Sequence, residues 1–343
     1  MTQKPLITFD THIDIPWPER TAEGLPAWVG DTQEDLWKRE TTRRFTVPKA
    51  QEGKLTAACL AAYIPQFLLT PEGYEAAWKR VQAMLEAIHT SVASAPKKNQ
   101  ARLCVTEHEI REAVEKGMVA IVPVVENGYA IGEDPSRIAW LAQQYGVRYM
   151  TLTHNGHNQL ADAAVARGEA EKKYGGLSTL GREVIAEMNR HAMVVDVSHT
   201  SKQSMMQATE LSRAPVLASH SCVRALCDHP RNLDDEQLDR LRDTGGLLQV
   251  TAMGAFLKRG GGGTLETLID HITYTVERIG VEHVGFSSDF DGGGGIDGWE
   301  DASQTASVIE RLKHAGFDES ERRALCGENM MRLLKQAENV ALQ

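Results

Sequence analysis

Short apolar runs recur along the chain, and each is followed by a longer stretch with helical periodicity. The runs are apolar on both faces, as expected of buried parallel strands. They predict eight strands, at Leu6–Phe9, Ala57–Ile64, Val119–Val125, Tyr149–Leu152, Met193–Val197, Val216–Ala218, Leu247–Val250 and Val284–Phe286. The stretches between them predict helices, for example at Tyr74–Val92, Thr106–Glu115, Pro135–Gln144 and Leu180–Arg190.

Strands that alternate with helices indicate a parallel α/β fold, and eight such units predict a closed (β/α)8 barrel. The length of 343 residues suits one barrel with insertions, although it would also accommodate two ordinary domains. We expect a single barrel domain over residues 1–343, because neither a domain boundary nor a repeat is visible. The alternative, an open doubly wound sheet, normally carries a glycine-rich turn after its first strand, and residues 11–14 contain no glycine.

A long insertion separates the first two predicted strands, roughly from Pro16 to Lys54, and it is rich in Trp, Arg and Glu. Loops of this length are usually functional, so we interpret it as a cap or lid over the barrel mouth. The glycine-rich stretches Gly260–Gly263 and Gly292–Gly295 lack the Lys-Ser/Thr ending of a phosphate-binding loop. We interpret both as loops at the barrel mouth.

Composition and charge exclude several classes of function. The net charge of −10, without a basic block, argues against a nucleic-acid partner. Neither a run of 18 apolar residues nor a signal-peptide core or GPI signal is present, so we expect a cytoplasmic protein without a membrane partner. The five cysteines are scattered and form no Cys-x-x-Cys pair, which predicts reduced, buried thiols rather than a thiolate metal site.

Polar residues follow the predicted strands at their carboxyl ends, where α/β barrels carry their chemistry. The first strand is followed by His12 and Asp14, whose spacing puts both side chains on one face of an extended segment. Later strands are followed by further imidazoles and carboxylates: Glu126, His154, His199, His220 and Asp289. An isolated histidine is usually structural, but four histidines and three carboxylates at one rim predict a metal site.

The number of candidate ligands indicates two metal ions. A zinc site takes four ligands as a rule, with one position left for water in an enzyme. Five groups with mixed nitrogen and oxygen donors are available: His12, Asp14, Glu126, His199 and His220. A carboxylate that bridges two ions would divide this set evenly, and Glu126 lies between the others in barrel order. Such ions typically lie about 3.5–4 Å apart and activate a shared hydroxide.

Motifs around these positions resemble the membrane (renal) dipeptidase family, in family order over nearly the whole chain. They are Phe9–Trp17 with its His-x-Asp, Val125–Gly128, Leu152–Asn155, Asp196–His199, Ser219–Ser221, His229–Asn232, His283–Gly292 and Gly327–Met330. The resemblance implies that His12 and Asp14 bind one zinc ion, that His199 and His220 bind the other, and that Glu126 bridges them. It further implies that His154 contacts the substrate and stabilises the tetrahedral intermediate, that Arg231 binds the substrate carboxylate and that Asp289 transfers protons.

The expected activity is hydrolysis of dipeptides through a metal-bridging hydroxide. The segment Asn155–Leu160 lacks the tryptophan that family members often carry there, with Leu160 directly before Ala161-Asp162. The segment Leu60–Ile64 also departs from the aromatic-rich animal version. We expect both segments to line the substrate pocket, which leaves the dipeptide and its stereochemistry open. Two alternatives remain: hydrolysis of another amide, cyclic amide or lactone, and a non-catalytic metal-binding barrel.

Two of the assigned residues also have structural alternatives. Arg231 could form an ion pair with Asp234 or Asp235, and Asp289 could cap a turn unless Asp291 does so. The expected partner is a small dipeptide, and the sequence also allows a homodimer.

Overall fold

The fold is built on one sheet of parallel strands. In the computed structural model, which describes residues 5–15, 36–97, 100–168 and 172–343, eight strands pair in sequence order around the sheet. They are β1 (Phe9–Asp14), β2 (Ala57–Tyr63), β4 (Val119–Glu126), β5 (Tyr149–Thr151), β6 (Val194–Asp196), β7 (Leu217–Ser221), β8 (Leu247–Thr251) and β9 (Val284–Ser287). A short strand, β3 (Ala101–Leu103), pairs with β4 beside this path.

The sheet closes between β1 and the residues that follow β9. Ile13 pairs in parallel with Phe290. The amide of Asp14 donates to the carbonyl of Phe290 (2.9 Å), and the amide of Asp289 donates to the carbonyl of His12 (3.0 Å). The predicted (β/α)8 barrel is therefore confirmed, and its closing seam carries three of the predicted site residues.

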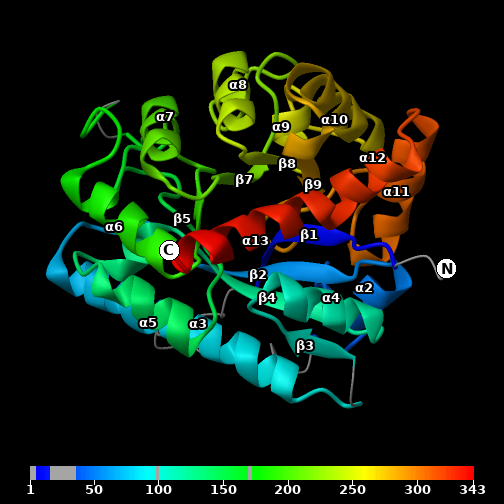
Figure 1. The fold of residues 1–343 in the computed structure, drawn as a ribbon, viewed down its shortest axis with the longest axis horizontal. Coiled ribbons are helices and arrows are strands. Elements are labelled where there is room, and N and C mark those ends of the chain that lie inside the picture. Colours follow the sequence, from blue (N-terminus) through cyan, green and yellow to red (C-terminus); the bar gives the residue numbers. More distant parts are fainter. Residues whose placement is uncertain (1–4, 16–35, 98–99, 169–171) are drawn as a thin grey trace.

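Helices cover the outside of the sheet (Figure 1). They are α2 (Val47–Glu52), α3 (Pro71–Ala93), α4 (Glu107–Glu115), α5 (Ser136–Gln144), α6 (Thr179–Arg190), α7 (Lys202–Leu211), α8 (Asp235–Asp243), α9 (Gly254–Leu257), α10 (Leu265–Ile279), α11 (Thr305–His314), α12 (Glu319–Arg323) and α13 (Asn329–Ala341). The four helices predicted from periodicity correspond to α3, α4, α5 and α6. Within the described residues, no helix is both long and apolar enough to span a membrane.

An apolar floor lies beneath the carboxyl end of β4. All residues of β4 are buried. Val122, Val124 and Glu126 lie on one face of the strand, because residues two apart in a strand point the same way. Val122 and Val124 pack with Ala57, Cys59 and other small side chains in one buried cluster. Glu126 is the last residue of the strand, so its carboxylate stands above this apolar layer.

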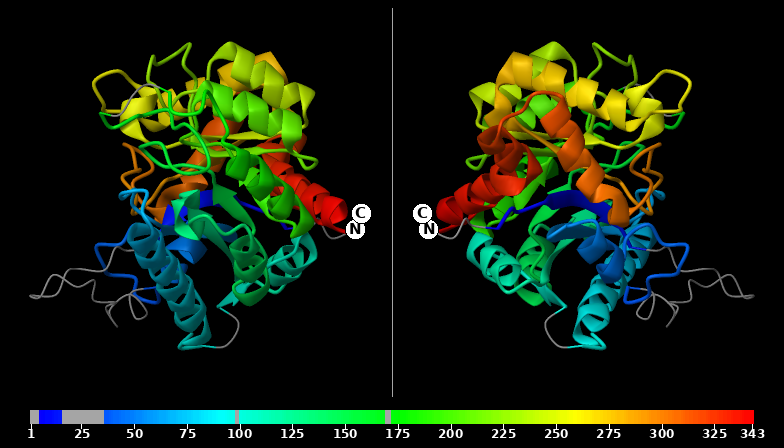
Figure 2. Two further views of the ribbon diagram at one scale, coloured as in Figure 1. Left: turned by 90° about the vertical axis from the view of Figure 1, so that its left-hand side faces the viewer. Right: turned by 90° about the vertical axis from the view of Figure 1, so that its right-hand side faces the viewer.

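The last helix covers the opposite end of the barrel. Asn329 at the start of α13 donates to the carbonyls of Val281 (2.7 Å) and Val284 (2.8 Å), which lie at the amino end of β9. Arg332 donates to the carbonyl of Gly245, just before β8 (3.1 Å). Figure 2 shows α13 (red) on the side of the molecule away from the yellow loop that follows β8. The carboxyl ends of the strands are therefore left open for a site.

The strands of the structure differ from the sequence prediction in two details. The first strand was predicted at Leu6–Phe9, whereas it runs from Phe9 to Asp14. Asp10, His12 and Asp14 are buried there, so polar residues that read as a loop in the sequence belong to the strand. The short strand β3 was not predicted, because its three residues are only half-buried and carry no strong apolar signal.

Most of the predicted lid lies outside the described residues. The part that is described, residues 36–54, forms α2 and contacts the loop that follows β9. The amides of Arg44 and Phe45 donate to the carboxylate of Asp291 (2.8 and 3.2 Å), and Lys49 pairs with Asp301 (3.0 Å). The end of the insertion is thus attached to the loop that carries Asp289.

Candidate metal centre and active site

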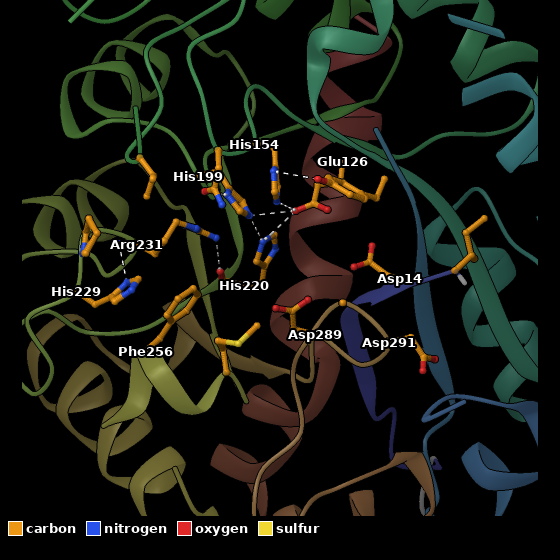
Figure 3. A pocket seen from close by; sticks show the side chains of 17 residues that line it. Asp14, Glu126, His154, His199, His220, His229, Arg231, Phe256, Asp289 and Asp291 are labelled. Carbon is orange, nitrogen blue, oxygen red and sulfur yellow. Dashed lines mark hydrogen bonds and ion pairs between the residues drawn. The ribbon is translucent and has the colours of Figure 1, made fainter. Parts of the chain in front are cut away.

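The residues predicted to form the site converge at the carboxyl end of the barrel (Figure 3). Seven of them line a cavity of about 730 Å³: Asp14, Glu126, His154, His199, His220, Arg231 and Asp289. The eighth, His12, is fully buried beside them. They come from β1, β4 and β7 and from the loops after β5, β6, β7 and β9, so six of the eight strand ends contribute residues that are distant from one another in sequence.

Glu126 lies at the centre of this cluster. Its Oε1 atom lies 3.1 Å from Nε2 of His199 and 3.4 Å from Nε2 of His220. The Nε2 atoms of His12 and His154 lie 3.8 and 3.9 Å from the same oxygen. One carboxylate is therefore within reach of four imidazoles, which is the arrangement that a bridging ligand requires.

The hydrogen bonds of His12 determine which of its ring nitrogens carries the proton. The Tyr149 hydroxyl donates to the carbonyl of Thr11 (2.8 Å). Its oxygen therefore accepts the bond from Nδ1 of His12, at 2.6 Å. Nε2 is left with a lone pair, and this buried atom has no hydrogen-bond partner.

The same reasoning applies to the two histidines beside Glu126. Ser219 donates its hydroxyl to Asp196 (2.5 Å), so its oxygen accepts from Nδ1 of His220 (2.8 Å). Nδ1 of His199 lies 3.1 Å from the amide oxygen of Asn155, which can only accept. Both rings therefore present an Nε2 lone pair to the central carboxylate.

This concentration of acceptors fits metal ions. Three imidazole lone pairs and a carboxylate oxygen face one another, and Oδ1 of Asp14 is also buried without a hydrogen-bond partner. Without a cation such acceptors repel one another, and mixed nitrogen and oxygen donors suit zinc and similar divalent ions. The described residues form three groups with ligand atoms within 4.8 Å of one another: His12–Glu126–His220, Glu126–His154–His199 and His12–Asp14–Asp289.

Burial controls the protonation of the cluster. It lowers the pKa of all four imidazoles, to about 3 for His12 and His154 and well below the usual value for His199 and His220. The rings are therefore neutral, which is the form that binds metal. Burial also raises the pKa of Glu126 and Asp14 well above the usual range, and the neighbouring carboxylates raise it further. A bound cation would offset the free-energy cost of ionising these buried carboxyl groups.

Asp289 lies beside Asp14 at the closing seam, with a left-handed backbone φ of 58°. Both carboxylates lie against Gly292: a Cβ atom at that position would lie 2.0 Å from Oδ2 of Asp14 and 2.6 Å from Oδ1 of Asp289. Burial raises the pKa of Asp289 to about 7, although the positive charge of Arg231 opposes the shift. A carboxyl group that titrates near neutrality can both accept and release a proton.

Arg231 makes no ion pair with the acids considered from the sequence. Asp234 caps α8 and pairs with Lys202 (2.7 Å), and Asp235 pairs with Arg278 (3.0 Å). Arg231 instead points into the cavity and donates from Nη2 to the carbonyl of His220 (3.2 Å). Its Nε is buried without a hydrogen-bond partner, and burial lowers the pKa of the guanidinium to about 10. The site thus contains a buried cation that can still bind an anion.

His154 differs from the other three imidazoles in its partner. Its Nδ1 faces the hydroxyl of Tyr63 at 3.5 Å, and the two rings pack with centroids 4.7 Å apart. A hydroxyl can donate to Nδ1, which places the ring proton on Nε2 and turns it toward the cavity. His154 can therefore present a donor where the other imidazoles present lone pairs.

Comparison with known proteins identifies the family of this chain. The model of the membrane dipeptidase family (peptidase family M19) matches residues 1–343. The chain belongs to this family. Dipeptidase verJ of Clonostachys rogersoniana is 31% identical over 355 residues, covering 99% of this chain and 86% of that protein. Dipeptidase aclJ of Aspergillus oryzae is 36% identical over 228 residues, which cover 66% of this chain and 53% of that protein.

A solved structure has the same fold. The probable dipeptidase PvdM from Pseudomonas aeruginosa superposes with a TM-score of 0.88 at 26% identity, covering 98% of this chain and 96% of that chain. Membership of the membrane dipeptidase family confirms the prediction of a peptide-bond hydrolase at the level of the family.

Two predictions about the surroundings of this dipeptidase-family site have different outcomes. Tyr63 and Asn155 line the cavity, as expected of the segments that depart from the family pattern. Leu160 does not: it is fully buried in the core, and a Cβ at Gly128 would lie 2.5 Å from it. The prediction that the segment Asn155–Leu160 lines the substrate pocket is therefore correct for Asn155 and wrong for Leu160, which packs in the hydrophobic core.

The cysteines take no part in the site. All five cysteines are free and buried, and burial raises the pKa of Cys222, so a thiolate nucleophile is not supported. The sequence analysis did not assign roles to the residues that orient the imidazoles: Tyr63, Tyr149, Asn155, Asp196 and Ser219. Asn155, Asp196 and Ser219 lie inside the motifs, which is the sequence signal that could have found them, whereas no motif contains Tyr63 or Tyr149.

Proposed function

We propose that this chain is a dipeptidase whose active site holds two zinc ions. In this proposal His12 and Asp14 would hold one ion, His199 and His220 would hold the other, and both ions would share Glu126. The observation that carries the proposal is the set of hydrogen bonds that leaves three Nε2 lone pairs facing Glu126. A non-catalytic polar core would pair these atoms with donors.

The ions would supply an activated water and would polarise the scissile carbonyl. The chain supplies the remaining groups. Asp289 accepts the proton that the attacking water loses and delivers it to the leaving nitrogen. His154 donates from Nε2 to the oxygen that becomes negative, because Tyr63 occupies its other ring nitrogen.

Arg231 accounts for the preference for short peptides in this proposal. Its guanidinium can bind a C-terminal carboxylate through two parallel hydrogen bonds. The carboxylate lies one residue beyond the scissile bond only in a dipeptide, so a longer peptide cannot satisfy the arginine and the metal cluster together. The dipeptidases among the relatives support this substrate class.

The test is hydrolysis of a dipeptide panel of mixed stereochemistry, before chelation, after chelation and after zinc is restored. We expect activity that disappears with the chelator, returns with zinc and is abolished by Asp289→Asn. Asp228→Asn is the matched control, because that carboxylate lies near the site in sequence but its side chain is 91% exposed. Cleavage of an amide or lactone but of no dipeptide would favour the alternative hydrolase, and metal binding without any turnover would favour a non-catalytic barrel.

A further inference from the structure

The cavity has an apolar wall beside Arg231. Met253, His229, Pro230 and Phe256 line it there, and none of the four carries a carboxylate, an ammonium or a guanidinium group. The Cζ atom of Arg231 lies 5.4 Å from the centroid of the Phe256 ring. The His229 ring packs on the same phenyl ring, with centroids 4.5 Å apart and an angle of 35° between the planes. In Figure 3 the rings of His229 and Phe256 lie beside Arg231, and they line the same cavity as Glu126.

Hydrogen bonds hold the wall and the arginine in one unit. Asn232, the neighbour of Arg231, donates from Nδ2 to the carbonyls of Phe256 and Cys227 (both 2.8 Å). The amide of Arg231 donates to Nδ1 of His229 (3.2 Å). The loop after β7 therefore fixes the guanidinium and the aromatic wall relative to each other.

A buried histidine on α10 strengthens this attachment. The amide of Val223 donates to Nδ1 of His271 (3.1 Å), so the ring proton is on Nε2 and is donated to the carbonyl of Leu257 (3.1 Å). One imidazole thus joins the loop after β7 to the helix that carries Phe256. The wall is preformed, so its position does not depend on a bound ligand.

The position of the wall constrains the residue whose carboxylate Arg231 would bind. That residue has its carboxylate at the guanidinium and its nitrogen at the metal cluster, so its Cα lies between them. Its side chain must leave from this Cα, and the apolar surface beside the guanidinium is the wall formed by Met253, His229 and Phe256. Phe256 is only half-buried, so its ring is available for contact.

We propose that Phe256, with Met253 and His229, forms the subsite for the side chain of the C-terminal residue and selects aromatic and large aliphatic residues there. The inference rests on the proposed dipeptidase activity and adds a substrate class to it. Contact with the rings buries apolar surface and allows offset aromatic packing. An acidic side chain would lose its hydration there and would face the C-terminal carboxylate that already occupies Arg231, and a basic side chain would face the guanidinium itself.

The experiment compares kcat/KM for Ala-Phe, Ala-Leu, Ala-Gly and Ala-Asp, each with both stereoisomers of the chiral C-terminal residue. The N-terminal residue is constant, so differences report on the C-terminal side chain. We expect the wild-type enzyme to favour Ala-Phe over Ala-Gly by about tenfold or more, with Ala-Asp the poorest substrate. Phe256→Ala should lower kcat/KM for Ala-Phe by about tenfold and for Ala-Gly by less than about threefold.

Two further variants complete the design. Phe67→Ala is the control for loss of an aromatic ring, because Phe67 is 51% exposed and does not line the cavity. Phe256→Leu keeps an apolar wall, and should retain activity on Ala-Leu while losing the preference for Ala-Phe. It serves in place of Phe256→Ala if the smaller residue prevents folding. Inhibition of Ala-Gly hydrolysis by free phenylalanine should weaken in both Phe256 variants.

The outcomes are separable. An equal loss on Ala-Phe and Ala-Gly in the Phe256 variants would show a structural role for the ring and would overturn the subsite while leaving the dipeptidase activity intact. A wild-type enzyme that cleaves Ala-Asp or Ala-Gly as well as Ala-Phe would overturn it too. Failure to cleave any dipeptide would instead overturn the proposed function, and the subsite with it.

Discussion

The Nε2 atoms of His199 and His220 lie 2.9 Å apart, at hydrogen-bond distance, although neither has a proton to share. Asn155 and Ser219 occupy the Nδ1 atoms of the two rings, so both Nε2 atoms present lone pairs. Both also face the carboxylate of Glu126. This arrangement is unfavourable as a polar core and favourable around cations, and it is the physical basis of the proposed zinc site.

The orienting hydroxyl of Tyr149 should contribute to metal affinity. Tyr149→Phe removes the acceptor for Nδ1–H of His12 and frees the ring to rotate or to change tautomer. We expect zinc affinity to fall by about 10–100-fold, as measured by competition with a chromogenic chelator. Tyr145→Phe removes a hydroxyl that contacts Glu86 on the outer surface and should leave affinity unchanged. Equal affinity in the wild type and Tyr149→Phe would contradict the role assigned to this hydrogen bond.

Gly292 should be essential for activity for a steric reason. The Cβ of Gly292→Ala would overlap the carboxylates of Asp14 and Asp289 and push them from their positions. A displacement of about 1 Å at a catalytic group can cost about 100-fold in rate, and we expect a loss of that size in kcat. Gly316→Ala is the contrasting variant: it faces open space at a left-handed φ of 98°, so it should lower the melting temperature but not kcat. Full activity in Gly292→Ala would refute the packing argument.

The stabilisation that zinc confers should increase with pH. Burial raises the pKa of Asp10 and Asp289 to about 7 and that of Asp14 and Glu126 well above the usual value. In the unfolded chain these groups ionise near pH 4. Below that pH they are protonated in both states, so their raised pKa values do not lower the free energy of unfolding. As the pH rises to the pKa of the folded state, the unfolded chain ionises first and the free energy of unfolding falls. A bound cation removes the destabilisation that ionised buried carboxyl groups cause. The zinc-induced rise in melting temperature should therefore grow between about pH 5 and pH 8. A constant or shrinking rise would be inconsistent with these shifts.

The carboxylate clamp can be tested by removing either partner. Arg231→Lys loses the bidentate geometry and should lower kcat/KM for dipeptides by about 100-fold without changing the zinc content. A C-terminally amidated dipeptide has already lost the negative charge, so the same substitution should affect its hydrolysis much less. If Arg231→Lys lowers kcat/KM equally for both substrates, the arginine does not bind the carboxylate.

The sequence was sufficient to predict the barrel and the positions of the site residues. Parallel strands that are buried on both faces read as apolar runs, as Val119–Glu126 does, and their carboxyl ends share one rim. The polar residues that follow six of the eight runs could therefore be assigned to that rim. Family resemblance then assigned roles, including that of Arg231, which no strand pattern indicates.

The sequence could not predict the contacts between residues that are distant along the chain. Tyr149 lies in an apolar strand and reads as a core residue, yet its hydroxyl contacts His12 across the barrel. The first strand was placed too early because buried polar residues resemble a loop when their partners are unknown. The sequence could not show which residues of Asn155–Leu160 face the pocket for a related reason, because the direction of a loop residue depends on packing that the sequence pattern does not encode.

The most direct test of the proposed site is anomalous diffraction at the zinc edge from crystals of the zinc-loaded protein. We predict two peaks per chain, about 3.5–4 Å apart, with the carboxylate of Glu126 between them. His12 and Asp14 should bind one ion, and His199 and His220 the other. A single peak, or two peaks that do not share Glu126, would contradict the proposed bridged site.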